Sequence, residues 1–467
     1  MNRHFLAVAF MALTVAAAQA TDPKGGISAD MLPRIKQAYK HTAADKALHN
    51  AITNVDINKL AVNTDTHNAF DTHFSHRVPS KGITNQRSSG RCWLFTGLNV
   101  LRAQMMNDHD LPRIEFSQNY NFFYDQLEKA NLFLQSIIDT SNRPMDDKTV
   151  DWLFQNPLSD GGQFTGVADI ITKYGVVPAD VMVETYASNN TSRISNLIGL
   201  KLKEYGLELR DMAANGAKSK AMADRKTEML GQIYRMLALG LGEPPTEFEW
   251  ARKDAKGNPI EEPRTYTPQQ FYKEYLGNDL RNDYVMVMND PSREFYKTYE
   301  IEFDRHTYDG DNWKYINLPI EDIKEMAIAS IKDSTAMYFS CDVGKFFDRD
   351  RGILDVDAYD YGSLFDTTFG MDKRQRILTH SSGSSHAMTL VAVDLDKEGK
   401  PTKWMVENSW GPGANDGHLI MTDKWFDEYM FRLVVDKKYL TPKVKALLNQ
   451  KPILLPAWDP MFAPDAD

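Results

Sequence analysis

Residues 85–95 constrain what this chain can fold into more than any other stretch. They form a loop of small and polar residues that stops at Cys92, and Leu94, Leu98 and Leu101 then recur at helical spacing. We therefore predict a helix that begins at or just before Cys92. The helix dipole and the unpaired N–H groups at such an end favour a thiolate over a thiol. Cys92 is thus the candidate nucleophile, with a buried structural cysteine as the common alternative.

The second of the 2 cysteines, Cys341, ends an apolar run over residues 336–340. This run predicts a strand with Cys341 as a small buried residue. A disulfide between Cys92 and Cys341 is the alternative that an exported chain allows. Both interpretations stay open on the sequence alone.

Residues 1–20 have the pattern of a secretory signal peptide. A basic end with Arg3 precedes the apolar residues 5–18, and residues 18–20 read Ala-Gln-Ala, a cleavage site. The apolar run is too short to cross a bilayer. We expect cleavage before Thr21 and export to a periplasm or the extracellular space. A retained anchor is the weaker alternative, and no stable membrane anchor is expected.

The 467 residues suffice for two ordinary domains or one large elaborated domain, and 42% hydrophobic residues allow a sizeable packed core. Changes in texture divide the chain into six parts. These are a signal peptide over 1–20, an N-terminal helical arm over 21–60, a helical region over 61–200, an insertion of helices and a small hairpin over 201–330, a strand-rich region over 331–455 and a C-terminal tail over 456–467.

A glycine turn, Gly161 and Gly162, precedes an expected helix over residues 164–174. Neither the Walker spacing nor G-x-G-x-x-G is present, so the turn is not a phosphate cradle. Glycines also let a peptide backbone approach the wall of a cleft closely. We prefer this second use and expect both glycines to bind substrate.

Two apolar strands near the C-terminus predict a hairpin, one over residues 386–393 and one over 402–407. If the strands are antiparallel, residues pair about the centre of the loop, near Lys397. His386 and Asn408 then lie side by side at the open end of the hairpin. This geometry favours His386 over the other histidines, including His380 in a Ser/Gly loop and His418 in a separate strand.

A cysteine nucleophile needs a base for its proton and a third group that orients the base. We assign these roles to Cys92, His386 and Asn408. The backbone N–H of Cys92 and the side-chain amide of Gln86 would stabilise a tetrahedral oxyanion. Trp410 is expected to shield the hydrogen bond between His386 and Asn408 from water, although a tryptophan in a turn is often only packing.

These residues resemble the papain-like cysteine peptidases. Longer strings resemble the bleomycin hydrolase and bacterial aminopeptidase C branch of that family, from about residue 60 to the C-terminus. The strings are Gln86-Arg87-Ser88-Ser89-Gly90-Arg91-Cys92-Trp93, Leu127-Glu128-Lys129-Ala130-Asn131, Cys341-Asp342-Val343-Gly344-Lys345, Val406-Glu407-Asn408-Ser409-Trp410-Gly411 and Trp458-Asp459-Pro460-Met461.

The resemblance implies an α+β fold with two papain-like lobes, one helical around Cys92 and one β-rich around His386, plus a large, mainly helical insertion. It implies a broad-specificity aminopeptidase that cleaves peptides through a thioester acyl-enzyme. It also implies a homohexamer, and a C-terminal carboxylate, here on Asp467, that meets the amino group of the substrate. The export signal departs from the usually cytosolic family, and the tail after Met461 is longer and more acidic than the family pattern.

Other functions stay open on the sequence. A cysteine endopeptidase or an acyltransferase would use the same thiolate, and an oligomeric binding protein is the alternative from another class. The net charge of −10 and the lack of basic runs argue against a nucleic-acid partner. No histidine and carboxylate cluster has metal-ligand spacing, so neither a metal nor an organic cofactor is expected.

Overall fold

The computed structural model describes residues 25–66 and 71–462, which form two compact units. The smaller unit, within residues 1–62 and 360–367, holds α1 (Met31–Lys36), α2 (Ala43–Ile52), α3 (Ile57–Ala61) and α12 (Tyr361–Phe365). Helix α12 packs on α3, where the hydroxyl of Tyr361 donates to Oδ1 of Asn58 at 2.7 Å. Helices α1 to α3 come from the region predicted to be a helical arm, whereas α12 comes from the region predicted to be strand-rich. The expected signal peptide over 1–20 lies outside the described residues.

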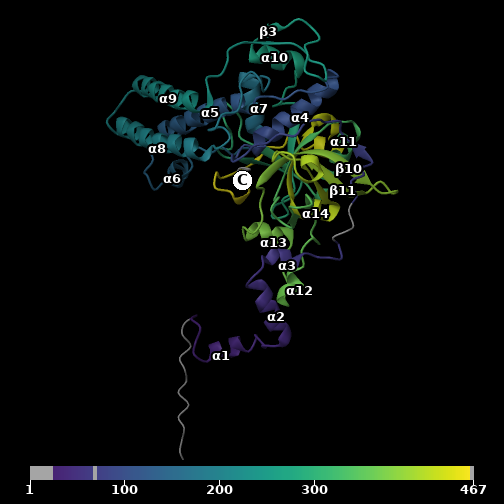
Figure 1. Cartoon of the computed structure of the whole chain (residues 1–467). Coiled ribbons are helices and arrows are strands. Elements are labelled where there is room, and N and C mark those ends of the chain that lie inside the picture. The colour runs from purple at the N-terminus through teal and green to yellow at the C-terminus, as the bar shows by residue number, and fades with distance from the viewer. Residues whose placement is uncertain (1–24, 67–70, 463–467) are drawn as a thin grey trace, which may run out of the picture. The chain divides into compact units, whose positions relative to one another are not determined.

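A mixed sheet of 12 strands dominates the larger unit (Figure 1). Its order is β14-β5-β6-β4-β13-β7-β10-β11-β12-β9-β8, and β1 also pairs with β10. The strands are β1 (His76–Arg77), β4 (Tyr284–Met288), β5 (Lys297–Ile301), β6 (Lys314–Asn317), β7 (Met337–Cys341), β8 (Phe347–Asp348), β9 (Ile353–Leu354), β10 (His386–Leu395), β11 (Pro401–Glu407), β12 (His418–Thr422), β13 (Met430–Asp436) and β14 (Ile453–Leu455).

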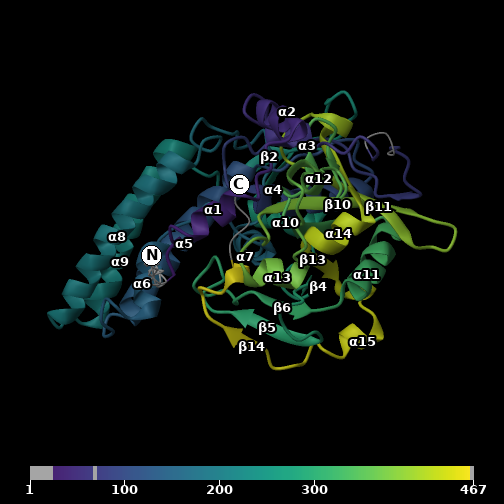
Figure 2. The same cartoon turned by 90° about the horizontal axis from the view of Figure 1, so that it is seen from below.

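The first part of the sequence of this unit is mainly helical. Its helices are α4 (Cys92–Asp108), α5 (Gln118–Asp139), α6 (Lys148–Gln155), α7 (Phe164–Tyr174), α8 (Ser192–Ala214), α9 (Ser219–Leu241) and α10 (Pro268–Tyr275). Among them α4 packs directly against β10 and β7, so the helix that starts at Cys92 lies on the sheet. Helices α8 and α9 run side by side along α5, away from the sheet (Figure 2). The remaining helices are α11 (Ile320–Lys332), α13 (Lys373–Leu378), α14 (Asp423–Tyr429), α15 (Pro442–Lys445) and the 3-10 turns η1 (Ala414–Gly417), η2 (Lys437–Tyr439) and η3 (Pro460–Phe462).

Local sequence signals account for most helix starts. Ser117 caps α5 by accepting from the N–H of Tyr120, and Thr267 forms a capping box ahead of Pro268 in α10. Helix α7 follows the glycine turn at the predicted residues. Strands β2 (Phe248–Trp250) and β3 (Arg264–Tyr266) form the predicted small hairpin. Strands β4, β5 and β6, from the last part of residues 201–330, join the large sheet.

The predicted hairpin of β10 and β11 is present, but its predicted register is wrong. Thr389 lies opposite Glu407, which centres the pairing on Glu398 rather than on Lys397. Irregularities between Leu390 and Ala392, and again beyond Asp394, shift the register along the strands. The two shifts cancel, because Leu395 opposite Pro401 is again centred on Glu398. The loop itself sets this centre, since the N–H of Asp396 donates to the carbonyl of Lys400 at 2.9 Å.

None of the helices in the described part of the chain is long and apolar enough to span a membrane. The described residues also hold no group of three or more histidine, cysteine, aspartate or glutamate side chains placed to bind a metal ion.

Candidate active site

Cys92 is the first residue of α4, as the sequence predicted. Its exposed fraction is 0%, so the residue is fully buried. The N–H groups at the start of a helix have no acceptor within the helix, and they surround this end of α4 with donors. Two residues before the cysteine, the N–H of Gly90 donates to Oδ2 of Asp160 at 2.9 Å. The same carboxylate leaves no room for a side chain at Gly90, because a Cβ there would lie 2.6 Å from Oδ1 of Asp160.

The side chain of Gln86 is held from both ends of its amide. Its Nε2 donates to the carbonyl of Ser89 at 2.8 Å, and its Oε1 accepts from the hydroxyl of Ser409 at 2.6 Å. The backbone N–H of Gln86 also donates to the carbonyl of Ser409 at 2.7 Å. Since Ser409 follows Asn408, the loop that leads to Cys92 is tied to the segment that carries Asn408.

His386 and Asn408 are hydrogen-bonded, with Nε2 of the histidine 2.8 Å from Oδ1 of the amide. Both are buried, and the ring of Trp410 stacks on the imidazole with centroids 4.8 Å apart. The pairing of β10 with β7 places Cys341 opposite His386. The Asn408 oxygen accepts from the histidine and so selects the tautomer with its proton on Nε2. The sequence prediction that these two residues meet is confirmed.

The other candidates from the sequence lie elsewhere. His380 is exposed at the end of the α13 turn, and His418 lies on β12 opposite Glu407, where burial lowers its pKa. Cys92 and Cys341 are both buried and both present as thiols, so the alternative of a disulfide between them is not what the structure shows.

Gly161 and Gly162 form a wall that several side chains fix from behind. Nζ of Lys129 donates to the carbonyls of Ser159 and Gly161 at 2.9 and 2.7 Å. Nε1 of Trp93, the residue after the candidate nucleophile, donates to the carbonyl of Asp160 at 2.9 Å. A Cβ on Gly162 would lie 2.3 Å from the ring of His306. The absence of a side chain is therefore a packing requirement at Gly162.

His306 and Asp125 form a buried pair behind this wall that sequence reasoning missed. Nδ1 of His306 lies 2.5 Å from Oδ1 of Asp125, and Lys129 contacts the same carboxylate at 2.9 Å. Burial lowers the pKa of His306, while Lys129 and His306 hold the pKa of Asp125 below its usual value despite its burial. The pair is therefore a neutral imidazole that donates to an ionised carboxylate. The spacing of Asp125 and Lys129, one helical turn apart, was the only signal of it in the sequence.

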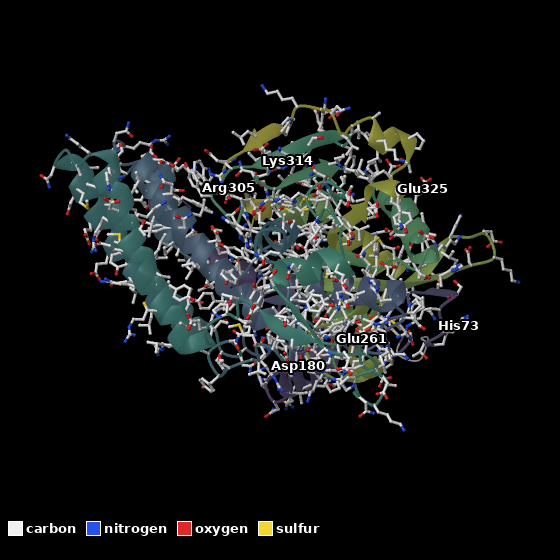
Figure 3. The ribbon with its side chains drawn as sticks, turned by 90° about the horizontal axis from the view of Figure 1, so that it is seen from above. His73, Asp180, Glu261, Arg305, Lys314 and Glu325 are labelled. Carbon is white, nitrogen blue, oxygen red and sulfur yellow. The ribbon has the colours of Figure 1, made fainter. Side chains whose placement is uncertain are left out.

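A cavity of about 290 Å³ adjoins the glycine wall on the side of Lys129 and His306, which both line it. Its lining is mainly apolar, with Leu132, Trp152 and Phe303 among the contributors. Arg305 also lines the cavity. In Figure 3 it lies between helices α8 and α9 on one side and strand β6, which carries Lys314, on the other. Such a cavity suits a ligand with an apolar part and a few polar contacts.

The described part of the C-terminal tail is anchored by cations of the larger unit. Nη2 of Arg293 lies 2.5 Å from Oδ2 of Asp459, and Arg432 donates to the carbonyl of Met461 at 2.8 Å. Nζ of Lys148, at the start of α6, lies 4.1 Å from the ring centroid of Trp458. Asp467, the residue that the sequence assigned to the substrate amino group, lies outside the described residues.

Comparison with known proteins places this arrangement among relatives. The family model described as Peptidase C1-like family matches residues 26–462. Bleomycin hydrolase of Homo sapiens is 40% identical over 402 residues, which cover 84% of this chain and 88% of that protein. Aminopeptidase C of Streptococcus thermophilus is 36% identical over 438 residues, which cover 93% of this chain and 98% of that protein.

The fold also matches a solved structure. The crystal structure of PepW from Lactobacillus rhamnosis covers 94% of this chain and 100% of that chain, with a TM-score of 0.89 and 37% sequence identity. These matches confirm the resemblance and the papain-like α+β fold that the sequence predicted.

Proposed function

Since the chain belongs to the Peptidase C1-like family, and is a cysteine-type aminopeptidase of the bleomycin hydrolase and aminopeptidase C kind, we propose that Cys92 is its nucleophile. The substrates would be peptides of broad sequence that lose their N-terminal residues one at a time. One observation carries the assignment of the site, namely the hydrogen bond of 2.8 Å between His386 and Asn408. The residue after Asn408, Ser409, also donates a hydrogen bond to the side chain of Gln86.

In the proposed reaction the thiolate of Cys92 attacks the carbonyl carbon of the first peptide bond. The N–H of Cys92 and Nε2 of Gln86 donate to the oxyanion that forms, and each such donor contributes about 3 kcal/mol. The imidazolium of His386 then gives the proton on Nδ1 to the leaving amine, and a thioester remains on Cys92. A water molecule then attacks this thioester while His386 takes a proton from the water. This step releases the amino acid and restores the thiolate.

The restriction to N-terminal residues is proposed to come from the acidic tail. Residues 463–467 read Ala-Pro-Asp-Ala-Asp, and the terminal carboxylate of Asp467 would pair with the ammonium group of the substrate. The anchoring of Asp459 and Met461 by Arg293 and Arg432 supports this role, because it fixes the point from which the last residues extend. An endopeptidase would lack this carboxylate contact.

Matched peptides that differ only in N-acetylation test the proposal. The mature protein is expected to hydrolyse the free peptide and spare the acetylated one, and alkylation of Cys92 or the substitution Cys92→Ala is expected to abolish hydrolysis. Removal of residues 464–467 is expected to raise cleavage of the acetylated peptide. Full hydrolysis by Cys92→Ala would overturn the nucleophile, and unchanged selectivity after the truncation would overturn the tail.

Two further parts of the proposal rest on the sequence and the family. Export rests on the leader pattern of residues 1–20, and N-terminal sequencing of protein recovered outside the cytoplasm should give Thr21 as the first residue. A homohexamer rests on resemblance to the family, and sedimentation at several concentrations would measure it. A monomer at all concentrations would reject the hexamer without affecting the chemistry of Cys92.

A further inference from the structure

Arg102 lies where three segments that carry the proposed catalytic groups come together. It belongs to α4, the helix that Cys92 begins, and its side chain is 2% exposed. Its Nη2 donates to the carbonyl of Gly82 at 3.2 Å and also to Oε1 of Glu407. Glu407 immediately precedes Asn408, and its side chain is 1% exposed.

The contact with Gly82 connects Arg102 to the segment that leads to Gln86, the second proposed oxyanion donor. The chain continues from Gly82 through Thr84 to Gln86, and the carbonyl of Thr84 accepts from the N–H of Gly411 at 2.9 Å. Asn99, one turn before Arg102 on α4, donates to the hydroxyl of Thr84 at 3.0 Å. One face of α4 therefore holds the loop that presents Gln86.

The contact with Glu407 reaches toward the histidine. Oε2 of Glu407 accepts from the hydroxyl of Ser80 at 2.9 Å, so both carboxylate oxygens are used. Asn408 follows Glu407 directly in the chain, so a shift of Glu407 along the sheet would move the Asn408 amide that orients His386. A buried ion pair resists such a shift, because separating its charges leaves each without compensation in a poorly polarisable interior.

We propose that Arg102 is a positioning residue, which fixes α4 against the Gln86 loop and the end of β11 so that Cys92, Gln86 and Asn408 keep one relative geometry. This inference rests on the proposed function. Its basis is that one guanidinium contacts the segment before Gln86 and the segment before Asn408 from the helix that starts at Cys92. Arginine suits the task because its planar, permanently charged fork is weakly hydrated and is the usual cation of buried ion pairs. One nitrogen of the fork, Nη2, makes both contacts.

The test compares three variants with the parent enzyme. Arg102→Lys keeps the charge without the fork. Arg102→Met combined with Glu407→Leu replaces the whole ion pair by apolar side chains, a change that often preserves stability where removal of one partner does not. Arg281→Lys is the control for replacing an arginine that pairs with a buried carboxylate. Arg281 is 33% exposed and pairs with the buried Asp169 of α7 at 2.9 Å, outside the three segments.

The measurements are the melting temperature, kcat and KM for the free peptide, with kcat normalised to the Cys92 that iodoacetamide labels. For Arg102→Lys and for the apolar pair we expect a folded protein, a KM within about twofold of the parent and a kcat lower by about 10-fold or more, because small displacements of reacting groups are costly. Arg281→Lys should leave both constants near those of the parent.

A folded Arg102→Lys or apolar-pair enzyme whose normalised kcat stays within about twofold of the parent would overturn the inference. So would a loss confined to KM, or a loss that matches the fraction of unfolded protein, because either would indicate a merely structural role. A parent that shows no Cys92-dependent hydrolysis would instead overturn the proposed function, and this inference with it.

Discussion

Nε2 of His386 lies 2.8 Å from Oδ1 of Asn408, although the two residues are 22 positions apart and lie at the ends of different segments. The amide oxygen can only accept, so it fixes the proton of the imidazole on Nε2 and leaves Nδ1 for proton transfer with sulfur. Trp410 stacks on the ring with centroids 4.8 Å apart, and His386 and Asn408 are both buried.

Replacement of Asn408 by Ala should therefore reduce turnover without abolishing it. The imidazole would lose its fixed tautomer and orientation, and we expect kcat to fall by about 100-fold, the lower end of what general acid–base catalysis contributes. Asn408→Asp retains an acceptor oxygen and should lose less. Steady-state kinetics on the free peptide measure both variants, and a kcat of the alanine variant equal to that of the parent would contradict the orienting role.

The proposed oxyanion donor gives a second prediction. Gln86→Ala removes one donor that acts on the transition state, so we expect kcat to fall by about 10²–10³-fold with little change in KM. Ser409→Ala is the matched variant, because it removes the hydroxyl that holds Oε1 of Gln86 and keeps the amide itself. Its loss should be smaller. An equal loss in both variants would show that Gln86 acts through packing rather than as a donor.

The glycine wall gives a prediction about stability. Gly162→Ala places a Cβ 2.3 Å from His306 and 2.8 Å from Trp93, both of which are buried and fixed by hydrogen bonds. We expect overpacking to lower the free energy of unfolding by about 1–3 kcal/mol. Urea unfolding measures this change.

Gly231→Ala serves as the control for that substitution. Gly231 is an exposed residue in the middle of α9, and a Cβ there would meet nothing within 4 Å. Alanine at this position should raise the free energy of unfolding by about 0.5–1 kcal/mol, because glycine is a poor helix former. Equal effects of the two substitutions would contradict the close packing at Gly162.

Much of the site could be predicted because its parts leave local marks. The helix start at Cys92 follows from the loop before it, and the meeting of His386 with Asn408 follows from two apolar strands joined by one loop. The centre of the pairing was predicted one residue too early, because the loop is closed by a hydrogen bond from the N–H of Asp396 to the carbonyl of Lys400 and is therefore centred on Glu398.

The charged groups behind the site escaped prediction for a different reason. Arg102 and Glu407 are 305 positions apart, and His306 and Asp125 are 181 apart. No spacing rule connects such residues, and a charged side chain is more often on the surface than in the core. These pairs become visible only when the fold brings together elements from distant parts of the chain.

The buried carboxyl of Asp169 in α7 makes the stability of the protein depend on pH in a particular direction. Burial raises its pKa to about 6, even though Arg281 at 2.9 Å opposes the shift. Between about pH 4 and pH 6 the folded state keeps a proton that the unfolded state has lost, so this group stabilises the fold less as pH rises through that window. Above about pH 7 its contribution is constant.

The difference in unfolding free energy between the parent and Asp169→Asn isolates this effect. From pH 3 to pH 7 the difference should change by about 3 kcal/mol against the parent, as a shift of about two pKa units requires. Arg281 stays charged throughout, so its lost partner adds only a constant offset. Asp254→Asn is the contrasting control, because hydrogen bonds from the Asn258 turn lower the pKa of Asp254 and the difference should move the opposite way. A pH-independent difference for Asp169→Asn would show that this carboxyl does not hold its proton in the folded state.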